Sequence, residues 1–216
     1  MMDILFPKLH KEGYRFLAIA AAITFVLLLI SNFFGIISFI ITIWIYYFFR
    51  DPERFPIGDD NYLLSPADGV VSQITKINGP KELGLENKNY TRVSIFMNVF
   101  DCHVNRFPCS ASVVEVFYKP GKYLNASLDK SSEENERNYV KIKNSNGEEL
   151  ILVQIAGLIA RRIVCDVRKD QDLKQGDKFG IIRFGSRVDL YFENYQLMVK
   201  PNQKTIGGET IIARKK

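Results

Sequence analysis

The sequence is poor in the side chains that most often carry metal chemistry. It has two histidines and three cysteines, Cys102, Cys109 and Cys165, with no CxxC pair. A zinc site needs several such ligands at short spacings, so the sequence predicts no metal site. An odd cysteine count in a chain long enough to build a hydrophobic core predicts reduced thiols rather than disulfides, which is typical of a cytoplasmic compartment.

Motifs for nucleotide binding and for serine hydrolysis are also missing. The chain has no Walker loop and no GxGxxG, and the two glycine positions of GxSxG around Ser186 hold Phe184 and Val188. The net charge is +5 with a pI near 9.0, but the basic residues are mixed with 24 acidic ones. Without an RNA-binding aromatic signature, this pattern favours an anionic lipid surface over nucleic acid as the partner.

Charge is absent from a long stretch near the N-terminus. Residues 16–49 contain no Asp, Glu, Lys or Arg and are mostly aliphatic or aromatic. One membrane crossing needs about 20 apolar residues, so this run is long for one span and short for two. Because the polar and glycine-containing break at Ser31 to Gly35 lies near its middle, we predict a basic segment over 1–15 followed by a membrane-embedded helical hairpin over 16–49.

The charges that flank this stretch indicate its orientation. Basic residues occur on both sides of it, at Lys8, Lys11 and Arg15 before it and at Arg50 and Arg54 after it. Positive charge at both ends favours both ends on the cytoplasmic side, so we expect the remainder of the chain to face the cytoplasm at the inner membrane. The alternative is one long tilted helix with the remainder outside the cytoplasm.

The rest of the chain, 50–216, has the pattern of a mostly β (α+β) soluble domain of antiparallel strands. The charged, proline-containing segment Arg50 to Pro56 ends the apolar part. Asn146-Gly147 suits a hairpin turn, and Leu128 to Asn138 is helical or loop-like, with Ser131 and Glu134 spaced as a capping box. The predicted strands are Leu63 to Ile77, Arg92 to Asn98, Ala111 to Tyr118, Tyr139 to Lys143, Glu149 to Ala156, Arg161 to Val167, Phe179 to Phe192, Tyr195 to Lys200 and Thr210 to Arg214.

Scarce histidine narrows the search for reactive groups. His103 follows a predicted strand in "MNVFDCHVNRFP", near Asp101 and Arg106, and strand ends often present functional side chains. The alternative for His103 is a hydrogen-bonded core histidine. His10 lies among basic residues before the apolar run, where we expect a solvated or interfacial role. Asp68, in "SPADGVV", reads by itself as ordinary turn chemistry.

The last unusual feature is a glycine inside a strand-like run. "IIRFGSRVDLYF", 181–192, is rich in β-branched and aromatic residues but is interrupted by Gly185 and Ser186. Glycine weakens a strand and usually marks a bulge or a close approach of backbone. Of the 14 glycines, Gly185 is the only one followed by serine.

Taken in order, several segments resemble a known family, the phosphatidylserine decarboxylases of the short, single-domain bacterial and archaeal type. The resemblance runs from about Arg50 to Phe192, and the Gly-Ser pair in its strand is its most diagnostic part. It rests on "FFRDPER", "SPADGVV", "MNVFDCHVNRFP", "YKPGKYLNASLDKSSEENERN", "QIAGLIARRIV" and "IIRFGSRVDLYF".

The resemblance implies an enzyme that makes its own cofactor. In this family the proenzyme cuts itself between Gly and Ser, here Gly185 and Ser186, into a β chain of 1–185 and an α chain of 186–216 that stay together. Ser186 becomes a covalent pyruvoyl group, which forms a Schiff base with the amine of phosphatidylserine and allows loss of carbon dioxide. The expected product is phosphatidylethanolamine, in phospholipid biosynthesis.

The local chemistry agrees with this assignment. For the Ser186 hydroxyl to attack the Gly185 carbonyl, the peptide must adopt a geometry that a Cβ would resist, and glycine permits it. The family pattern gives Asp68 a role in self-cleavage and His103 a role in proton handling. The long bacterial form has a second histidine where this chain has Arg106, so how Asp68 and His103 divide these roles stays open.

The resemblance leaves the lipid contacts and the lipid type open. Arg161, Arg162, Lys119 and Lys122 are candidates to bind lipid phosphate, with ordinary solvated charge as the alternative. A second function is decarboxylation of an archaeal ether-linked serine lipid, since the headgroup is identical. A third is a non-enzymatic, membrane-tethered β adaptor in which Gly185-Ser186 is only a bulge.

Overall fold

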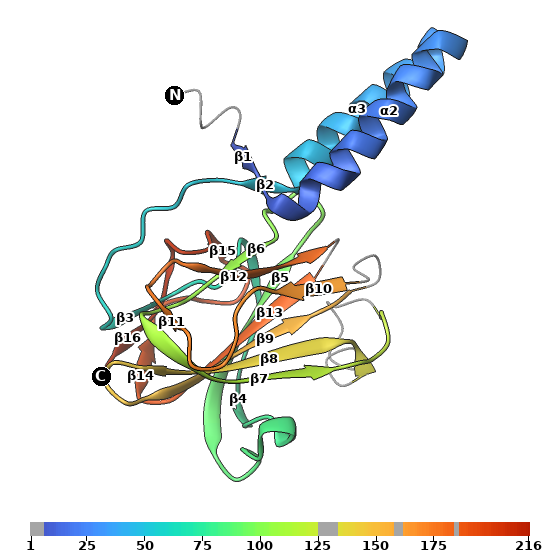
Figure 1. Cartoon of the computed structure of the whole chain (residues 1–216). Helices are drawn as coiled ribbons and strands as arrows, with labels where there is room; N and C mark the ends of the chain where they lie inside the picture. Colours follow the sequence, from blue (N-terminus) through green and yellow to red (C-terminus); the bar gives the residue numbers. More distant parts are fainter. Residues whose placement is uncertain (1–6, 125–133, 158–161, 184–185) are drawn as a thin grey trace. The chain divides into compact units, whose positions relative to one another are not determined.

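The computed structural model describes residues 7–124, 134–157, 162–183 and 186–216. The chain divides into two compact units, 1–53 and 54–216, and each is described by itself. Figure 1 labels their helices and strands. The boundary lies within the charged, proline-containing segment that follows the apolar run, close to the predicted start of the β domain at residue 50.

The first unit is a helical hairpin. Helices α2 (Tyr14–Ile30) and α3 (Asn32–Phe48) are separated only by Ser31, which confirms the predicted break. They follow β1 (Lys8–Leu9) and the short 3-10 helix η1 (Lys11–Gly13), and β2 (Arg50–Asp51) then pairs with β1. The continuous helical segment Lys11–Ile30 is long and apolar enough to cross a membrane, whereas Asn32–Phe48 is shorter.

The two helices are joined by hydroxyl groups and close packing. The Thr24 hydroxyl lies 2.8 Å from that of Ser38 and 2.9 Å from that of Thr42. A Cβ on Gly35 would overlap the side chain and Cα of Leu28, so glycine lets the helices approach there. Many of their apolar side chains point outward and are exposed, as expected of a hairpin that lipid surrounds.

The solvated role predicted for His10 was wrong, whereas the interfacial alternative stays a prediction. His10 is only 6% exposed, and its Nδ1 accepts a hydrogen bond from the backbone N–H of Glu12. Its backbone N–H donates to the carbonyl oxygen of Phe49. A histidine at the start of a 3-10 helix can satisfy an unpaired N–H, and this local capping explains its burial better than solvation does.

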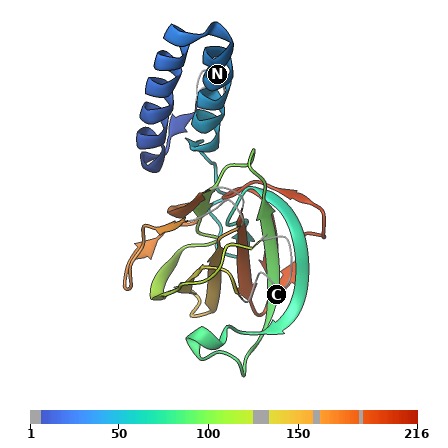
Figure 2. The ribbon, with the colours of Figure 1, turned by 90° about the vertical axis from the view of Figure 1, so that its right-hand side faces the viewer.

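The second unit consists of antiparallel strands, most of which form one large curved sheet (Figures 1 and 2). The long strands β4 and β5 pair with each other near one edge of this sheet. The large sheet has the order β11-β7-β8-β9-β13-β5-β4-β15. Two three-stranded sheets, β10-β12-β6 and β14-β16-β3, accompany it. The strands are β3 (Tyr62–Leu64), β4 (Gly69–Asn78), β5 (Asn89–Met97), β6 (Val104–Arg106), β7 (Ala111–Lys119), β8 (Arg137–Asn144), β9 (Glu149–Ile155), β10 (Arg162–Cys165), β11 (Asp172–Leu173), β12 (Lys178–Arg183), β13 (Ser186–Phe192), β14 (Tyr195–Leu197), β15 (Lys204–Thr205) and β16 (Ile211–Lys215); a 3-10 helix, η2 (Lys81–Leu83), follows β4.

The large sheet buries a different set of side chains on each face. On one face, Val188, Leu190 and Phe192 of β13 join the main hydrophobic core with residues of the two smaller sheets. On the other face, Tyr191 of β13 packs in a smaller cluster with Tyr90 and Tyr139. Successive side chains of a strand point to opposite faces of the sheet. Ser186 lies two residues before Val188 in β13, so its side chain is on the same face as Val188, toward the main core.

Two long predicted strands are each two strands in different sheets. The predicted strand Phe179 to Phe192 is β12 followed by β13, and Leu63 to Ile77 is β3 followed by β4. β12 ends at Arg183 and β13 begins at Ser186, and the residues between them lie outside the described ones; β3 and β4 are separated by "SPAD". Hydrophobic pattern alone does not reveal a change of sheet, because both parts keep β-like residues.

The other local predictions differ in outcome. The hairpin turn at Asn146-Gly147 joins β8 to β9, as predicted. Much of the segment Leu128 to Asn138, including Ser131 of its capping box, lies outside the described residues, while Arg137 and Asn138 begin β8 rather than end a helix or loop. The three cysteines are all free thiols, as predicted.

Candidate active site

Ser186 lies at the start of β13 and is fully buried. It is paired with Met97 of β5, and its hydroxyl donates a long hydrogen bond of 4.0 Å to the Met97 Sδ. Sulfur is a weak acceptor, so this contact orients the hydroxyl while binding its proton only weakly. Gly185, the other half of the predicted cleavage site, lies outside the described residues.

His103 is also fully buried, just before β6. Its Nδ1 is 2.9 Å from the carbonyl oxygen of Asp101, and a carbonyl can only accept, so Nδ1 carries a proton. In the neutral ring, Nε2 is therefore the nitrogen that can take up a proton. The His103 carbonyl accepts from the N–H of Ile182 at 3.3 Å, which ties this residue to the strand that leads toward Ser186.

A chain of buried amides leads to the serine. Asn138 donates to the Gln154 Oε1 at 3.0 Å, and Gln154 donates to the Asn105 Oδ1 at 2.9 Å. Asn105 in turn donates to the same Met97 sulfur that Ser186 contacts, at 3.8 Å. All three amides are 2% exposed or less, so each needs its partner to avoid an unsatisfied buried group.

His103 is linked to this chain of amides through the sequence. It lies two residues before Asn105 and immediately before β6. Asn105 and Ser186 share the Met97 sulfur. The structure therefore places the Ser186 hydroxyl beside a buried amide donor, and the participation of His103 in the same site stays a prediction.

Asp68 lies in the turn between β3 and β4. Its Oδ2 accepts from the Arg54 guanidinium at 2.7 Å, and its Oδ1 accepts from the N–H of Gly207 at 2.8 Å. The next residue, Gly69, has φ of +142°, and a Cβ there would overlap the carbonyl oxygen of Phe96, one residue before Met97. Asp68 is thus held at the start of β4, which pairs with β5 beside the serine strand.

Arg106 stands where the resemblance implies a second histidine in longer relatives. Its side chain is 6% exposed and donates to the carbonyl oxygen of Gly176 at 3.0 Å, and its backbone N–H donates to Pro66. It therefore links β6 to the loop before β12 and to the turn that carries Asp68. These contacts are typical of a buried arginine that stabilises the fold.

The candidate lipid-binding cations lie in different surroundings. Lys122 is exposed and forms an ion pair of 2.9 Å with Glu134, and Lys119 forms one of 2.8 Å with Glu82. Arg162 is exposed at the start of β10, opposite Arg183. Arg161 lies outside the described residues. Burial lowers the pKa of Arg183, the last residue of β12.

The sequence analysis missed the amides and Met97. One signal was available: Gln154 is the single polar residue after four apolar ones in "LILVQI", and a polar residue in such a run is usually hydrogen-bonded when buried. Asn105 stands two residues after His103, on the same side of an extended segment. Nothing in the local pattern marks Met97, whose position depends on the pairing of β5 with β13.

Comparison with known proteins gives consistent matches. A family described as phosphatidylserine decarboxylase matches residues 41–213. A phosphatidylserine decarboxylase proenzyme from Pelagibacter ubique is 63% identical over 215 residues, covering 100% of both chains. Proenzymes of the same name from Rickettsia typhi and Ruegeria pomeroyi are 51% and 48% identical, covering 97% and 99% of this chain and 91% and 98% of their own.

Proposed function

The chain belongs to the phosphatidylserine decarboxylase family, and from this premise we propose that it converts Ser186 into a pyruvoyl group and decarboxylates phosphatidylserine to phosphatidylethanolamine. The observation that carries the proposal is the position of Ser186. Its hydroxyl is fully buried at the start of a strand, beside a weak sulfur acceptor.

Self-cleavage begins with the Ser186 hydroxyl. Its oxygen attacks the Gly185 carbonyl carbon, the peptide C–N bond breaks, and the chain becomes an ester on the serine oxygen. His103, protonated on Nδ1, takes the hydroxyl proton on Nε2 and returns a proton to the departing amine. Elimination of the ester leaves Gly185 as a carboxylate and residue 186 as dehydroalanine, which water converts to the keto group with release of ammonia.

The surrounding strands fit a residue that must stay in place after the cut. From Arg187 onward β13 is hydrogen-bonded to β5 on one side and to β9 on the other. The new N-terminus at residue 186 therefore remains in the sheet without the peptide bond to Gly185. Large and small chains would separate only if these ladders broke, which supports a stable complex of 1–185 and 186–216.

Once formed, the pyruvoyl group supplies an electron sink for the loss of carbon dioxide. The residues of this chain then have two tasks. His103 holds, on Nε2, the proton that replaces the departing carboxyl group on the substrate carbon. The buried surroundings of Ser186 and His103 exclude bulk water from the reacting carbon. Asp68, bonded to Arg54 and Gly207, orients the turn beside β5.

The apolar hairpin fits a lipid substrate. We propose that α2 and α3 hold the enzyme in the inner membrane with the β domain in the cytoplasm, because basic residues flank both ends of the apolar run. A tethered enzyme meets a headgroup at the membrane surface without extracting the lipid. Arg161, Arg162 and Lys122 remain candidates to bind the lipid phosphate.

The decisive experiment compares wild-type protein with Ser186→Ala in detergent micelles that contain phosphatidylserine. Wild type should yield a fragment of 31 residues, 186–216, whose N-terminus is blocked and reacts with carbonyl reagents. Ser186→Ala should remain uncut and inactive, because it has no hydroxyl to attack the peptide. Mass spectrometry of the fragment and carbon dioxide release are the two readouts.

Ser72→Ala is the matched control, since Ser72 is an exposed serine on β4. It should be cut and active like wild type. An uncut wild-type chain that still releases carbon dioxide would contradict the pyruvoyl mechanism, and an uncut, inactive wild-type chain would favour the adaptor. Comparing diacyl with dialkyl serine lipids tests the ether-lipid alternative, which the names of the relatives do not favour.

A further inference from the structure

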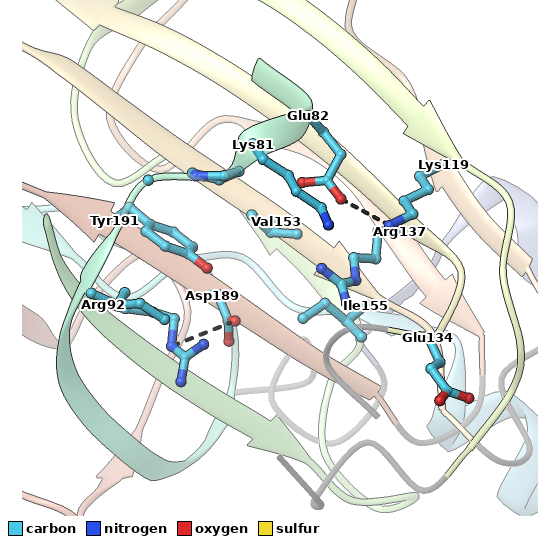
Figure 3. Close-up of a pocket in the computed structure, with 13 residues that line it drawn as sticks. Lys81, Glu82, Arg92, Lys119, Glu134, Arg137, Val153, Ile155, Asp189 and Tyr191 are labelled. Atoms are coloured by element: carbon cyan, nitrogen blue, oxygen red, sulfur yellow. Dashed lines mark hydrogen bonds and ion pairs between the residues drawn. The ribbon is translucent and has the colours of Figure 1, made fainter. Parts of the chain in front are cut away.

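A cavity of about 400 Å³ lies on the face of the large sheet that carries the smaller tyrosine cluster. Strand alternation puts Asp189 and Tyr191 of β13 on this face and the Ser186 hydroxyl on the other. Figure 3 shows Arg137 beside Ile155, with the Glu82–Lys119 pair on one side and the Arg92–Asp189 pair on the other. The proposed decarboxylation gives this cavity no role.

Unpartnered polar atoms gather on this face. Among the described residues of this face, six buried side-chain nitrogen or oxygen atoms have no hydrogen-bond partner. They belong to Thr75, Tyr90, Arg92, Ser94 and Arg137. Native proteins leave few such groups, and a concentration of them indicates a site that something else completes.

The strongest of these signals is the guanidinium of Arg137. Its Nη1 donates to the Tyr139 hydroxyl at 2.9 Å, whereas Nε and Nη2 are buried without a partner. Nε and Nη2 form one edge of the guanidinium, and this edge binds carboxylates and phosphates with two parallel hydrogen bonds. Arg187 uses the same edge on Asp189, with both bonds at 2.7 Å. The equivalent edge of Arg137 has no such partner.

The charges around the cavity favour an anion. Four cations line it, Lys81, Arg92, Lys119 and Arg137, against three carboxylates. Each carboxylate already has a cationic partner, because Glu82 pairs with Lys119, Asp189 with Arg187 and Glu134 with Lys122. Burial raises the pKa of Tyr139 to about 12, so its hydroxyl stays neutral and does not compensate the charge of Arg137.

We propose that this cavity is a second binding site, for a phosphate-type oxyanion held by the Nε and Nη2 edge of Arg137. Arg137 lines the cavity, and its bond to Tyr139 occupies only Nη1, so the Nε and Nη2 edge is the part of the guanidinium left for a ligand. The Arg92 guanidinium, 7% exposed and 4.0 Å from Asp189, adds a second positive group on the same face. The same chemistry is found in soluble phosphates and in phospholipid headgroups.

Binding is measured by calorimetry on the full-length protein in detergent micelles. One arm titrates inorganic phosphate at constant ionic strength, and the other titrates short-chain phosphatidylglycerol below its micellar concentration. Saturable binding in either arm that weakens about tenfold or more in Arg137→Gln supports the site, because a charge-assisted bidentate contact is lost. The arm that responds identifies the source of the phosphate group.

Arg168→Gln is the matched control, since it removes the same charge from an exposed arginine that does not line the cavity. It should bind like wild type. If Arg137→Gln fails to fold, Arg137→Lys decides, because it keeps the charge but lacks the two-bonded edge and should also bind more weakly. No binding in either arm, or equal binding by wild type and both Arg137 variants, would overturn the site. Because the readout is binding, its failure leaves the proposed decarboxylation untouched.

Discussion

At the residue scale, the Ser186 hydroxyl contacts the Met97 sulfur, and Asn105 donates to the same atom. The sequence singles out Ser186 and His103 as candidates by one glycine-serine pair and one scarce histidine, since rare residues in special contexts limit the choices. Asn105, Gln154 and Met97 were not found, because they matter through contacts between β5, β6, β9 and β13 that have no local pattern. A side chain that acts through contacts with neighbouring strands can be recognised only once the pairing of those strands is known.

The amide chain leads to a prediction for Asn105→Ala. This change removes the donor to Met97 and leaves the Gln154 amide without its acceptor, at a cost of about 1–3 kcal/mol in the free energy of unfolding. Because the sulfur that contacts Ser186 is then less well held, self-cleavage should slow by about tenfold to hundredfold. The rate at which the uncut chain disappears after synthesis measures this effect.

Asn144→Ala is a control that distinguishes an effect of Asn105 on the position of Ser186 from a general loss of protein stability. Asn144 is another buried amide, bonded to Glu148 and to the Tyr195 hydroxyl, away from the serine. It should destabilise the protein similarly while self-cleavage keeps its normal rate. If both variants slow cleavage equally, Asn105 has no specific role in orienting the site.

At the element scale, the sequence predicted what a segment prefers but not which sheet it joins. The apolar run gave both helices and their break at Ser31, because helices depend on contacts close in sequence. The divisions of 63–77 and 179–192 were missed, since they depend on pairing with distant strands. Short strands such as β6 and β11 were missed for the same reason, as two or three residues carry no period of their own.

The start of β4 gives a prediction at this scale. Gly69→Ala would put a Cβ against the carbonyl oxygen of Phe96 at a φ of +142° that alanine rarely adopts, so the β4–β5 pairing must shift. Strain of this kind costs about 1–3 kcal/mol, and it moves Asp68 relative to the serine strand. We expect lower thermal stability and slower self-cleavage, measured by calorimetry and by gel electrophoresis.

Gly84→Ala provides the comparison. Gly84 also has a positive φ, +65°, but a Cβ there would meet no atom within 4 Å. It should cost some stability and leave self-cleavage unchanged. Normal processing of Gly69→Ala would show that the position of Asp68 does not matter for cleavage.

At the scale of the whole molecule, the two units have opposite surface chemistry. The leucine, isoleucine and phenylalanine side chains of α2 and α3 are largely exposed. The β domain buries the same residue types in its main core. A hairpin with such an exterior is stable when lipid covers it, and a soluble protein rarely exposes so much apolar surface. The hydroxyl contacts of Thr24 with Ser38 and Thr42 satisfy polar groups inside the hairpin, as a lipid environment requires.

The single tryptophan provides a test of whether the helical hairpin enters the membrane. Trp44 lies in α3, so in vesicles its fluorescence should be quenched by lipids that carry bromine on their acyl chains and not by unbrominated lipids. Trp44→Phe combined with Phe179→Trp moves the fluorophore into the buried core of the β domain, where quenching should be lost. Unquenched Trp44 in protein that sediments with the vesicles would mean that the hairpin does not enter the acyl-chain region, and the membrane topology proposed for the chain would then be wrong.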